Sequence, residues 1–288
     1  MNPRIRNALA LLVPIALLTA SAGTGTGGSS REQMGGAGHS RVGPFLSAFG
    51  TPVRGFPSPG DKPEGLAWDG GYLWCNNFTD GTLYKIDPKD GSVVARYQGQ
   101  GLPSAPEGLA WDGEHLWTAH WHTGVIYKMR ETVSGMEIVQ EFDKPQGAGS
   151  TVGLGWDGTS VWLSCWPSPD FGGKAQLFEL DPKTLEVRHV RLLPVLWIED
   201  LAWDGRWFWS ADWLNSIAFA LDPATGDTLH SFASPGPNPV GTAWDGTHLW
   251  MTYTTRDSIW AVDISDVRTS VQTTSWTRFK ALFRPGAR

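Results

Sequence analysis

The sequence predicts an all-β fold, a five-bladed β-propeller with four antiparallel strands in each blade. The first observation is a Trp-Asp-Gly motif followed by a second tryptophan, which recurs five times. The second is its spacing, because the motif tryptophans lie 43, 45, 47 and 41 residues apart, the period of one four-stranded blade. The third is a similar strand and turn pattern after each copy. The motif tryptophans are Trp68, Trp111, Trp156, Trp203 and Trp244.

The repeats span most of the 288 residues, so one propeller domain is expected over residues 44–288, with repeats starting near residues 63, 106, 151, 198 and 239. Ten of the seventeen tryptophans occupy the two fixed tryptophan positions of the repeats, which places them mainly in the core. The formal charge of −6 and the lack of a basic stripe argue against a nucleic-acid partner. A monomer is expected.

Residues 1–22 have the pattern of a secretory signal peptide. Arg4 and Arg6 precede an apolar run, and the small residues Ala20-Ser21-Ala22 resemble a cleavage site. The apolar run is short for a spanning helix, so no membrane span is predicted. Residues 23–43 are rich in glycine, serine and threonine and are expected to be a flexible linker. The protein is therefore expected to be secreted or periplasmic.

Two cysteines are available to this exported chain. Cys75 and Cys165 fall in the first and third repeats, at different offsets from the motif tryptophan. Blades that are not neighbours hold their β-carbons beyond disulfide reach. Both thiols are therefore predicted to be unpaired and mostly buried.

The first repeat shows the strand order expected within a blade. Leu66-Ala67-Trp68 alternates large and small residues, as a strand packed between two unlike faces does. Asp69-Gly70 is a strong hairpin signal, because glycine accepts the positive φ of a tight turn. Strands are then expected at Leu73-Trp74, at Leu83–Ile86 and at Ser92–Tyr97.

The fifth repeat lacks a clear fourth strand, which would leave an exposed sheet edge. Two segments could supply the missing strand and close the ring. One is the apolar stretch Phe45–Phe56, which stands before the first repeat, and the other is the tail Trp276–Phe283.

One end of the propeller is predicted to carry the binding site. The segment leading into each innermost strand and the connection from second to third strand share this end, and these segments vary most between repeats. Glutamates precede the Gly-Leu-Ala step in three repeats, so carboxylates are expected around the mouth of the central channel. The residues at this position are Glu64, Glu107, Val152, Glu199 and Val240, and Asp200 takes the glycine place of the fourth repeat.

Aromatic and polar residues are expected to surround these carboxylates. They lie three and four positions beyond the second tryptophan of each repeat. The pairs are Asn77-Phe78, His120-Trp121, Cys165-Trp166, Asp212-Trp213 and Tyr253-Thr254. Acidic and aromatic groups around a concave mouth are typical of a small-ligand site. The alternative is structural, because a polar residue at a strand end often caps its own hairpin and a loop tryptophan often covers the core.

No metal site is predicted at the pair His120 and His122. Side chains on separate blades start about 10 Å apart, whereas zinc ligands lie about 2 Å from the ion. Calcium held by Glu64, Glu107 and Glu199 at the narrow mouth is the remaining metal alternative, and no other cofactor is expected.

The five repeats, the Glu-Gly-Leu step and the loop tryptophans together resemble the propeller-type glutaminyl cyclases of plants and bacteria, over roughly Pro63 to Asp263. The resemblance implies an enzyme that closes an N-terminal glutamine into pyroglutamate. It also implies Glu107 as the catalytic carboxylate that shuttles the amine proton, with Trp121 and Trp213 at the family's tryptophan positions. The chain departs from the family pattern at several positions: Glu64 replaces glutamine, Val152 tryptophan, Glu199 asparagine and Thr254 lysine.

Two functions are therefore predicted. The first is an exported propeller that binds a small or peptidic ligand at an acidic, tryptophan-lined mouth, without catalysis of its own. The ligand-binding residues would be Glu64, Asn77, Glu107, His120, Trp121, Trp166, Glu199, Asp200, Asp212, Trp213 and Tyr253. The alternative is a glutaminyl-peptide cyclotransferase-like enzyme in which Glu107 acts as the catalytic residue.

Overall fold

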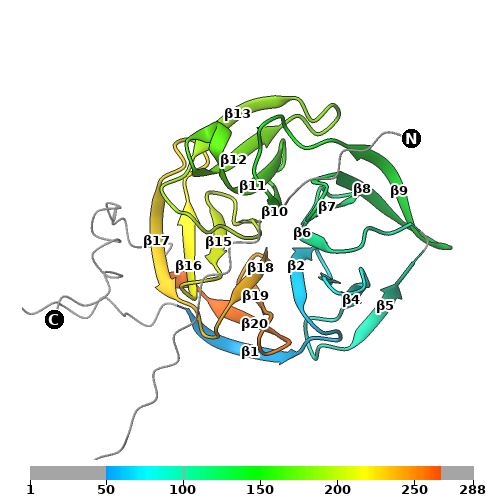
Figure 1. The fold of residues 1–288 in the computed structure, drawn as a ribbon. Helices are drawn as coiled ribbons and strands as arrows, with labels where there is room; N and C mark the ends of the chain where they lie inside the picture. Colours follow the sequence, from blue (N-terminus) through cyan, green and yellow to red (C-terminus); the bar gives the residue numbers. More distant parts are fainter. Residues whose placement is uncertain (1–49, 100, 267–288) are drawn as a thin grey trace, which may run out of the picture. The chain divides into compact units, whose positions relative to one another are not determined.

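The computed structural model describes residues 50–99 and 101–266, and these form five four-stranded antiparallel sheets arranged as a ring (Figure 1). Each sheet is one blade, and its innermost strand lies beside the central axis. The predicted five-bladed propeller is thus confirmed. The signal peptide and linker predicted for residues 1–43 lie outside the described residues, as does the tail from residue 267.

Four blades are built from consecutive strands, and the fifth recruits β1. Blade 1 contains β2 Pro63–Trp68, β3 Leu73–Asn77, β4 Leu83–Ile86 and β5 Val93–Tyr97. Blade 2 contains β6 Pro106–Trp111, β7 Leu116–His120, β8 Ile126–Thr132 and β9 Gly135–Phe142. Blade 3 contains β10 Thr151–Trp156, β11 Val161–Ser168, the short 3₁₀-helix η1 Pro169–Phe171, β12 Lys174–Leu180 and β13 Val187–Leu192. Blade 4 contains β14 Ala202–Trp203, β15 Phe208–Asp212, β16 Ile217–Leu221 and β17 Thr228–Ala233. Blade 5 contains β18 Pro239–Trp244, β19 Leu249–Tyr253, β20 Ser258–Asp263 and β1 Thr51–Pro57.

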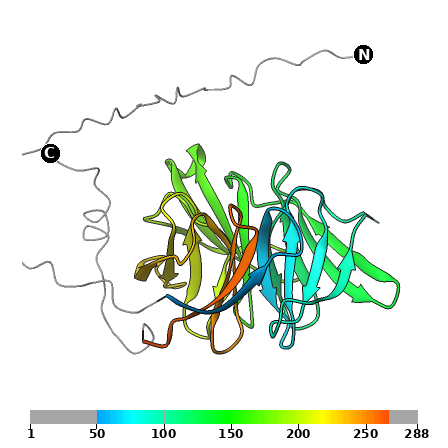
Figure 2. The ribbon, with the colours of Figure 1, turned by 90° about the horizontal axis from the view of Figure 1, so that it is seen from below.

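The N-terminal strand β1 closes the ring. It pairs antiparallel with β20, with Phe56 opposite Ile259, and so becomes the outermost strand of blade 5. Of the two predicted closing segments, the one before the first repeat is therefore the correct one. Chain ends far apart in sequence are joined in one sheet, which removes the exposed edge that β20 would otherwise present. Figure 2 shows β1 and β20 side by side in a view along the side of the ring.

The aspartate of each motif holds its hairpin and the second tryptophan together. In blade 1, one Asp69 oxygen accepts hydrogen bonds from the backbone nitrogens of Gly71 and Tyr72, and the other accepts from Trp74 Nε1 at 2.9 Å. Gly70 has φ of 99° in this turn, a value that favours glycine. The same aspartate–indole bond recurs in the other blades: Asp112–Trp117, Asp157–Trp162, Asp204–Trp209 and Asp245–Trp250, at 2.7 to 3.0 Å.

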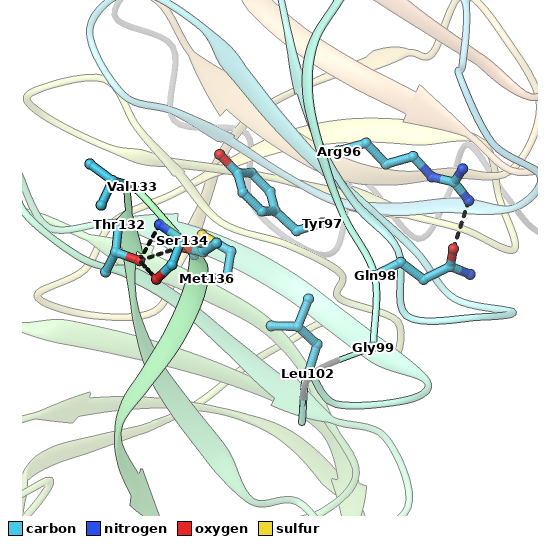
Figure 3. A pocket seen from close by; sticks show the side chains of 10 residues that line it. Arg96, Tyr97, Gln98, Gly99, Leu102, Thr132, Val133, Ser134 and Met136 are labelled. Carbon is cyan, nitrogen blue, oxygen red and sulfur yellow. Dashed lines mark hydrogen bonds between the residues drawn. The ribbon is translucent and has the colours of Figure 1, made fainter.

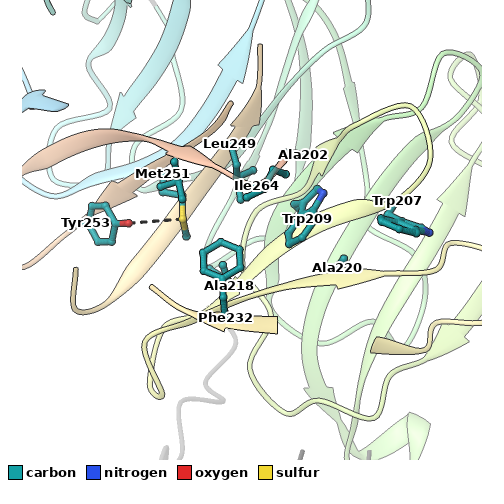
Figure 4. Packing of buried hydrophobic residues seen from close by; sticks show 12 residues of the cluster. Ala202, Trp207, Trp209, Ala218, Ala220, Phe232, Leu249, Met251, Tyr253 and Ile264 are labelled. Carbon is teal, nitrogen blue, oxygen red and sulfur yellow. Dashed lines mark hydrogen bonds between the residues drawn. The ribbon is translucent and has the colours of Figure 1, made fainter. Parts of the chain in front are cut away.

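The core lies between neighbouring blades. The second tryptophans are at most 3% exposed and pack against residues of the adjacent sheet. Between blades 4 and 5, Trp209 and Phe232 face Met251 and Tyr253 of the next blade (Figure 4). The unpaired thiols predicted for Cys75 and Cys165 are confirmed, and both are buried. Burial raises the pKa of each thiol.

Candidate functional site

The innermost strands β2, β6, β10 and β18 approach each other closely because the third residue of each is glycine. Four repeats have Gly65, Gly108, Gly153 or Gly241 at this position, and the fourth repeat has Asp200. A β-carbon built at Gly108 would collide with Asp200 Oδ1 and with the backbone of Gly153. The glycines therefore leave the axial space into which the aspartate side chain of blade 4 extends.

The Asp200 carboxylate joins the blades at the axis. One oxygen accepts from the backbone nitrogens of Leu66 at 2.9 Å and Leu109 at 3.3 Å, and the other from Leu154 at 3.1 Å. Asp200 is 2% exposed, and burial raises its pKa to about 7 although these backbone donors favour the ionised form. Asp200 was predicted among the ligand-binding residues, and the structure shows both of its carboxyl oxygens accepting hydrogen bonds from the backbone of blades 1, 2 and 3.

A cavity of about 270 Å³, the axial pocket, opens at the end of the ring predicted to carry the site. It combines carboxyl groups with aromatic walls, and six of the predicted ligand-binding residues come together in it. Phe78 and Val240 complete the lining. The lining residues are Glu64, Phe78, Glu107, Trp121, Trp166, Glu199, Trp213 and Val240.

The three glutamates come from three different blades, and their pKa values are raised together. Glu107 and Glu199 are 6% and 4% exposed. Burial and then repulsion by Asp200 raise the pKa of Glu64 to about 8, although the charge of Lys62 acts the other way. Burial, then Glu64, raises the pKa of both Glu107 and Glu199. The three carboxyl groups therefore hold their protons to a higher pH than exposed glutamates do.

Indole rings form one wall of the pocket. Trp121 and Trp166 meet edge to face with centroids 4.8 Å apart, and Trp166 meets Trp197 in the same way at 5.0 Å. The Trp166 indole nitrogen donates to the carbonyl oxygen of Ile198 at 3.1 Å, which fixes the ring. Trp197 was missed from sequence because it precedes the fourth repeat at an offset that no other repeat shares. Its only signal is an unmatched tryptophan two residues before a predicted site glutamate.

Besides Asp200, four predicted ligand-binding residues lie outside this lining and have structural partners. Asn77, His120 and Asp212 cap their own hairpins by accepting backbone N–H groups, and buried Tyr253 bonds Ser234. The caps are Asn77 to Thr79 at 2.8 Å, His120 Nδ1 to His122 at 3.1 Å, and Asp212 to Asn215 at 2.8 Å. These contacts match the structural alternative, which strand-end polar residues often follow.

Two other cavities differ in character from the axial pocket. One, of about 80 Å³, lies at the opposite end of the channel and is lined by all five motif tryptophans. The other, of about 330 Å³, lies between β5 and the β8–β9 hairpin (Figure 3). There Arg96 donates to Gln98 at 2.8 Å, so its charge is engaged locally. Neither cavity gathers carboxyl groups.

Neither a cluster of metal-ligating residues nor a membrane-spanning helix is found within residues 50–99 and 101–266. No group of three or more His, Cys, Asp or Glu residues in these ranges is arranged to hold a metal ion. No helix in the same ranges has the length and apolar character needed to cross a bilayer.

Comparison with known proteins places the fold. No protein-family model and no curated protein sequence matches the chain. Among solved structures, glutaminyl cyclase from Myxococcus xanthus is similar with a TM-score of 0.62 and 20% identity, over 75% of this chain and 97% of that one. A chain of a nidogen/laminin complex is similar with a TM-score of 0.51 and 17% identity, over 72% of this chain and 78% of that one.

Virginiamycin B lyase from Staphylococcus aureus is a more distant match, with a TM-score of 0.43 and 17% identity over 72% of this chain and 68% of that one. The resemblance to glutaminyl cyclases that the sequence predicts is thus confirmed as a likeness of fold. The count of five blades comes from the sheets of this chain, and the comparisons show a likeness of fold alone.

Proposed function

We propose that this protein is an exported propeller that binds a small or peptidic ligand in the axial pocket, without catalysis of its own. The observation that carries the proposal is the convergence of three glutamates from three blades with three tryptophans and a phenylalanine in one cavity. Concave sites with apolar walls and a few convergent polar groups are the usual form of a ligand site.

The size of the pocket favours a small ligand or one end of a peptide. Its volume of about 270 Å³ is near the lower end of the range for ligand pockets, about 300–1,000 Å³. Further along the axis of the ring, the channel is narrowed by the Asp200 carboxylate and the backbone N–H groups that donate hydrogen bonds to it. A ligand would therefore enter the axial pocket at the end of the ring that carries the three glutamates, and bind there without passing along the channel.

Calorimetric titration of a small-molecule and peptide library tests this proposal. Wild-type protein is compared with a Glu107→Gln/Trp121→Ala double variant and with a Glu114→Gln control, whose exposed carboxylate lies in the turn at the opposite end. The expected result is binding by wild type and control, with a loss of at least about tenfold in the double variant. Equal binding by all three proteins would contradict the proposal.

The second candidate is a glutaminyl-peptide cyclotransferase-like activity, favoured by the surroundings of Glu107. Its buried carboxyl lines the same cavity as Trp121 and Trp213, and burial raises its pKa above the usual value, which suits a group that takes up and returns a proton. The two candidates are distinguished by incubating the protein with peptides that begin with glutamine and measuring the peptide masses. Loss of ammonia that disappears in Glu107→Gln supports the enzyme, and unchanged peptides at high protein concentration eliminate it.

Export and a monomeric state complete the proposal. The signal-peptide pattern of residues 1–22 supports cleavage and secretion, either to the periplasm or outside the cell. N-terminal sequencing of protein from the cell envelope and medium tests this, with a start after residue 22 expected. Light scattering coupled to gel filtration tests the monomer.

A further inference from the structure

The axial pocket has an excess of negative groups over positive ones. Glu64, Glu107 and Glu199 line it, and among residues 50–99 and 101–266 no lysine, arginine or histidine contributes to the lining. Lys62 is the one cation whose charge lowers the pKa of Glu64, and its side chain is exposed. Positive charge inside the cavity would therefore have to come from a ligand.

A second observation points to a ligand that donates hydrogen bonds. Glu199 Oε1 is buried and has no hydrogen-bond partner in the described part of the chain, although the residue is only 4% exposed and lines the cavity. A buried carboxyl oxygen without a donor is costly. An N–H group in the pocket would satisfy it, whereas a quaternary ammonium group has no N–H to give.

The walls between the carboxyl groups are apolar. Phe78, Trp121, Trp166 and Trp213 present aromatic rings and Val240 presents methyl groups. Aromatic faces attract ammonium groups within about 6 Å of the ring centroid, and they also pack well against methylene groups. Carboxyl groups separated by apolar walls match a chain in which ammonium groups are separated by methylenes.

We propose that the axial pocket binds a compact aliphatic diamine or polyamine, with its ammonium groups on the glutamates and its methylenes against the indoles. This inference rests on the proposed function of the same pocket and names its ligand class. Three carboxyl groups carry more negative charge than one ammonium group neutralises, so a second ammonium group on the same chain adds a further favourable charge interaction in the pocket.

Binding of such a ligand would release protons. Burial and mutual repulsion raise the pKa values of Glu64, Glu107 and Glu199, so these groups hold protons in the free protein. A bound polycation favours the ionised carboxylates, so the affinity should rise from pH 6 to pH 9 while the amines stay charged. The groups facing the glutamates include Asp200 and Asp212, whose charges add to the repulsion, and Lys62, which opposes it.

Four probes of equal chain length test the inference by calorimetry at pH 8 and low salt: 1-butanol, n-butylamine, butyltrimethylammonium and 1,4-diaminobutane. We expect the diamine to bind at least about tenfold more tightly than n-butylamine, since a second charged hydrogen bond contributes about 1.4 kcal/mol or more. n-Butylamine should exceed its trimethylated counterpart, and butanol should be weakest. Equal affinities of n-butylamine and diamine, or tighter binding of calcium ion than of the diamine, would overturn the inference.

Variants separate this inference from the proposed function. Glu107→Gln and Glu199→Gln should each remove most of the advantage of the diamine over n-butylamine, and the Glu114→Gln control should retain it. Circular dichroism and melting curves check that each variant is folded. If all probes bind alike and the Glu107→Gln/Trp121→Ala variant loses them, only the diamine inference fails. If the diamine binds the wild type and that double variant equally, both proposals fail.

Discussion

Replacing Asp200 by glycine would restore the repeat pattern and yet destabilise the protein. The other four repeats have glycine at this position, so sequence consensus alone favours the change. In the structure, however, the backbone nitrogens of Leu66, Leu109 and Leu154 would lose their shared acceptor. The hydrogen bonds of the axial carboxylate and the repeat pattern therefore lead to opposite expectations for this substitution.

The magnitude follows from these hydrogen bonds. A buried donor that loses its acceptor costs about 1–3 kcal/mol, so the three backbone N–H groups together cost roughly 3–9 kcal/mol. Release of a buried carboxyl group and entry of water into the channel offset part of this, leaving a loss of about 3–5 kcal/mol in the free energy of unfolding. That is a large share of the about 5–15 kcal/mol typical of a folded domain.

Guanidinium unfolding at pH 7, followed by tryptophan fluorescence and circular dichroism, measures this loss. Asp200→Ala is the matched control, because it removes the carboxylate without the extra backbone freedom of glycine, which costs about 0.5–1 kcal/mol. Both variants should unfold at much lower denaturant with an unchanged m-value. A loss below about 1 kcal/mol in both variants would refute the structural role assigned to this carboxylate.

Three further predictions concern the fold and the axial acids. The pKa values of the glutamates are higher in the folded protein than in the unfolded chain, where they are about 4.3. The contribution of these groups to the free energy of unfolding is therefore fully present below about pH 4.3 and is lost as the pH rises through the folded-state pKa values. The melting temperature at pH 5 should accordingly be higher than that at pH 9. Glu107→Gln should flatten this dependence, and equal melting temperatures at both pH values would contradict the account. Asp245→Ala should cost about 1–3 kcal/mol, because the Trp250 indole and two turn amides lose their acceptor; an unchanged free energy of unfolding would contradict it. Cys75 and Cys165 should resist a thiol reagent in the native protein and react in guanidinium, and rapid native labelling would show that they are exposed.

The repeat explains why the fold could be predicted from sequence. A Trp-Asp-Gly step that recurs at one blade's spacing determines hairpin, core tryptophan and strand order together, as the bond from Asp69 to Trp74 shows. Glu64, Glu107 and Glu199 could be placed at one mouth because the ring brings equivalent repeat positions to the same height.

The remaining features depend on departures from the repeat, which periodicity does not describe. In the sequence, Asp200 is simply a second acidic residue beside Glu199. Only the arrangement at the axis shows that its carboxyl oxygens accept hydrogen bonds from backbone N–H groups. His120 and Asp212 have residue types suited to binding as well as capping, and the tight hairpins decide for capping. Trp197 packs against the lining residue Trp166 from a segment whose tryptophan has no match in the other repeats.

The central claim is that glutamates from three blades line the axial pocket together. Carbon-13 NMR titration of their side-chain carboxyl groups tests this claim most directly. With signals assigned by single Glu→Gln variants, Glu64, Glu107 and Glu199 should titrate well above the usual value of about 4.3, with Glu64 near pH 8. Removing Glu64 should lower the pKa of both Glu107 and Glu199. Three independent titrations near the usual value would show that these carboxyl groups face solvent separately, and would contradict the account.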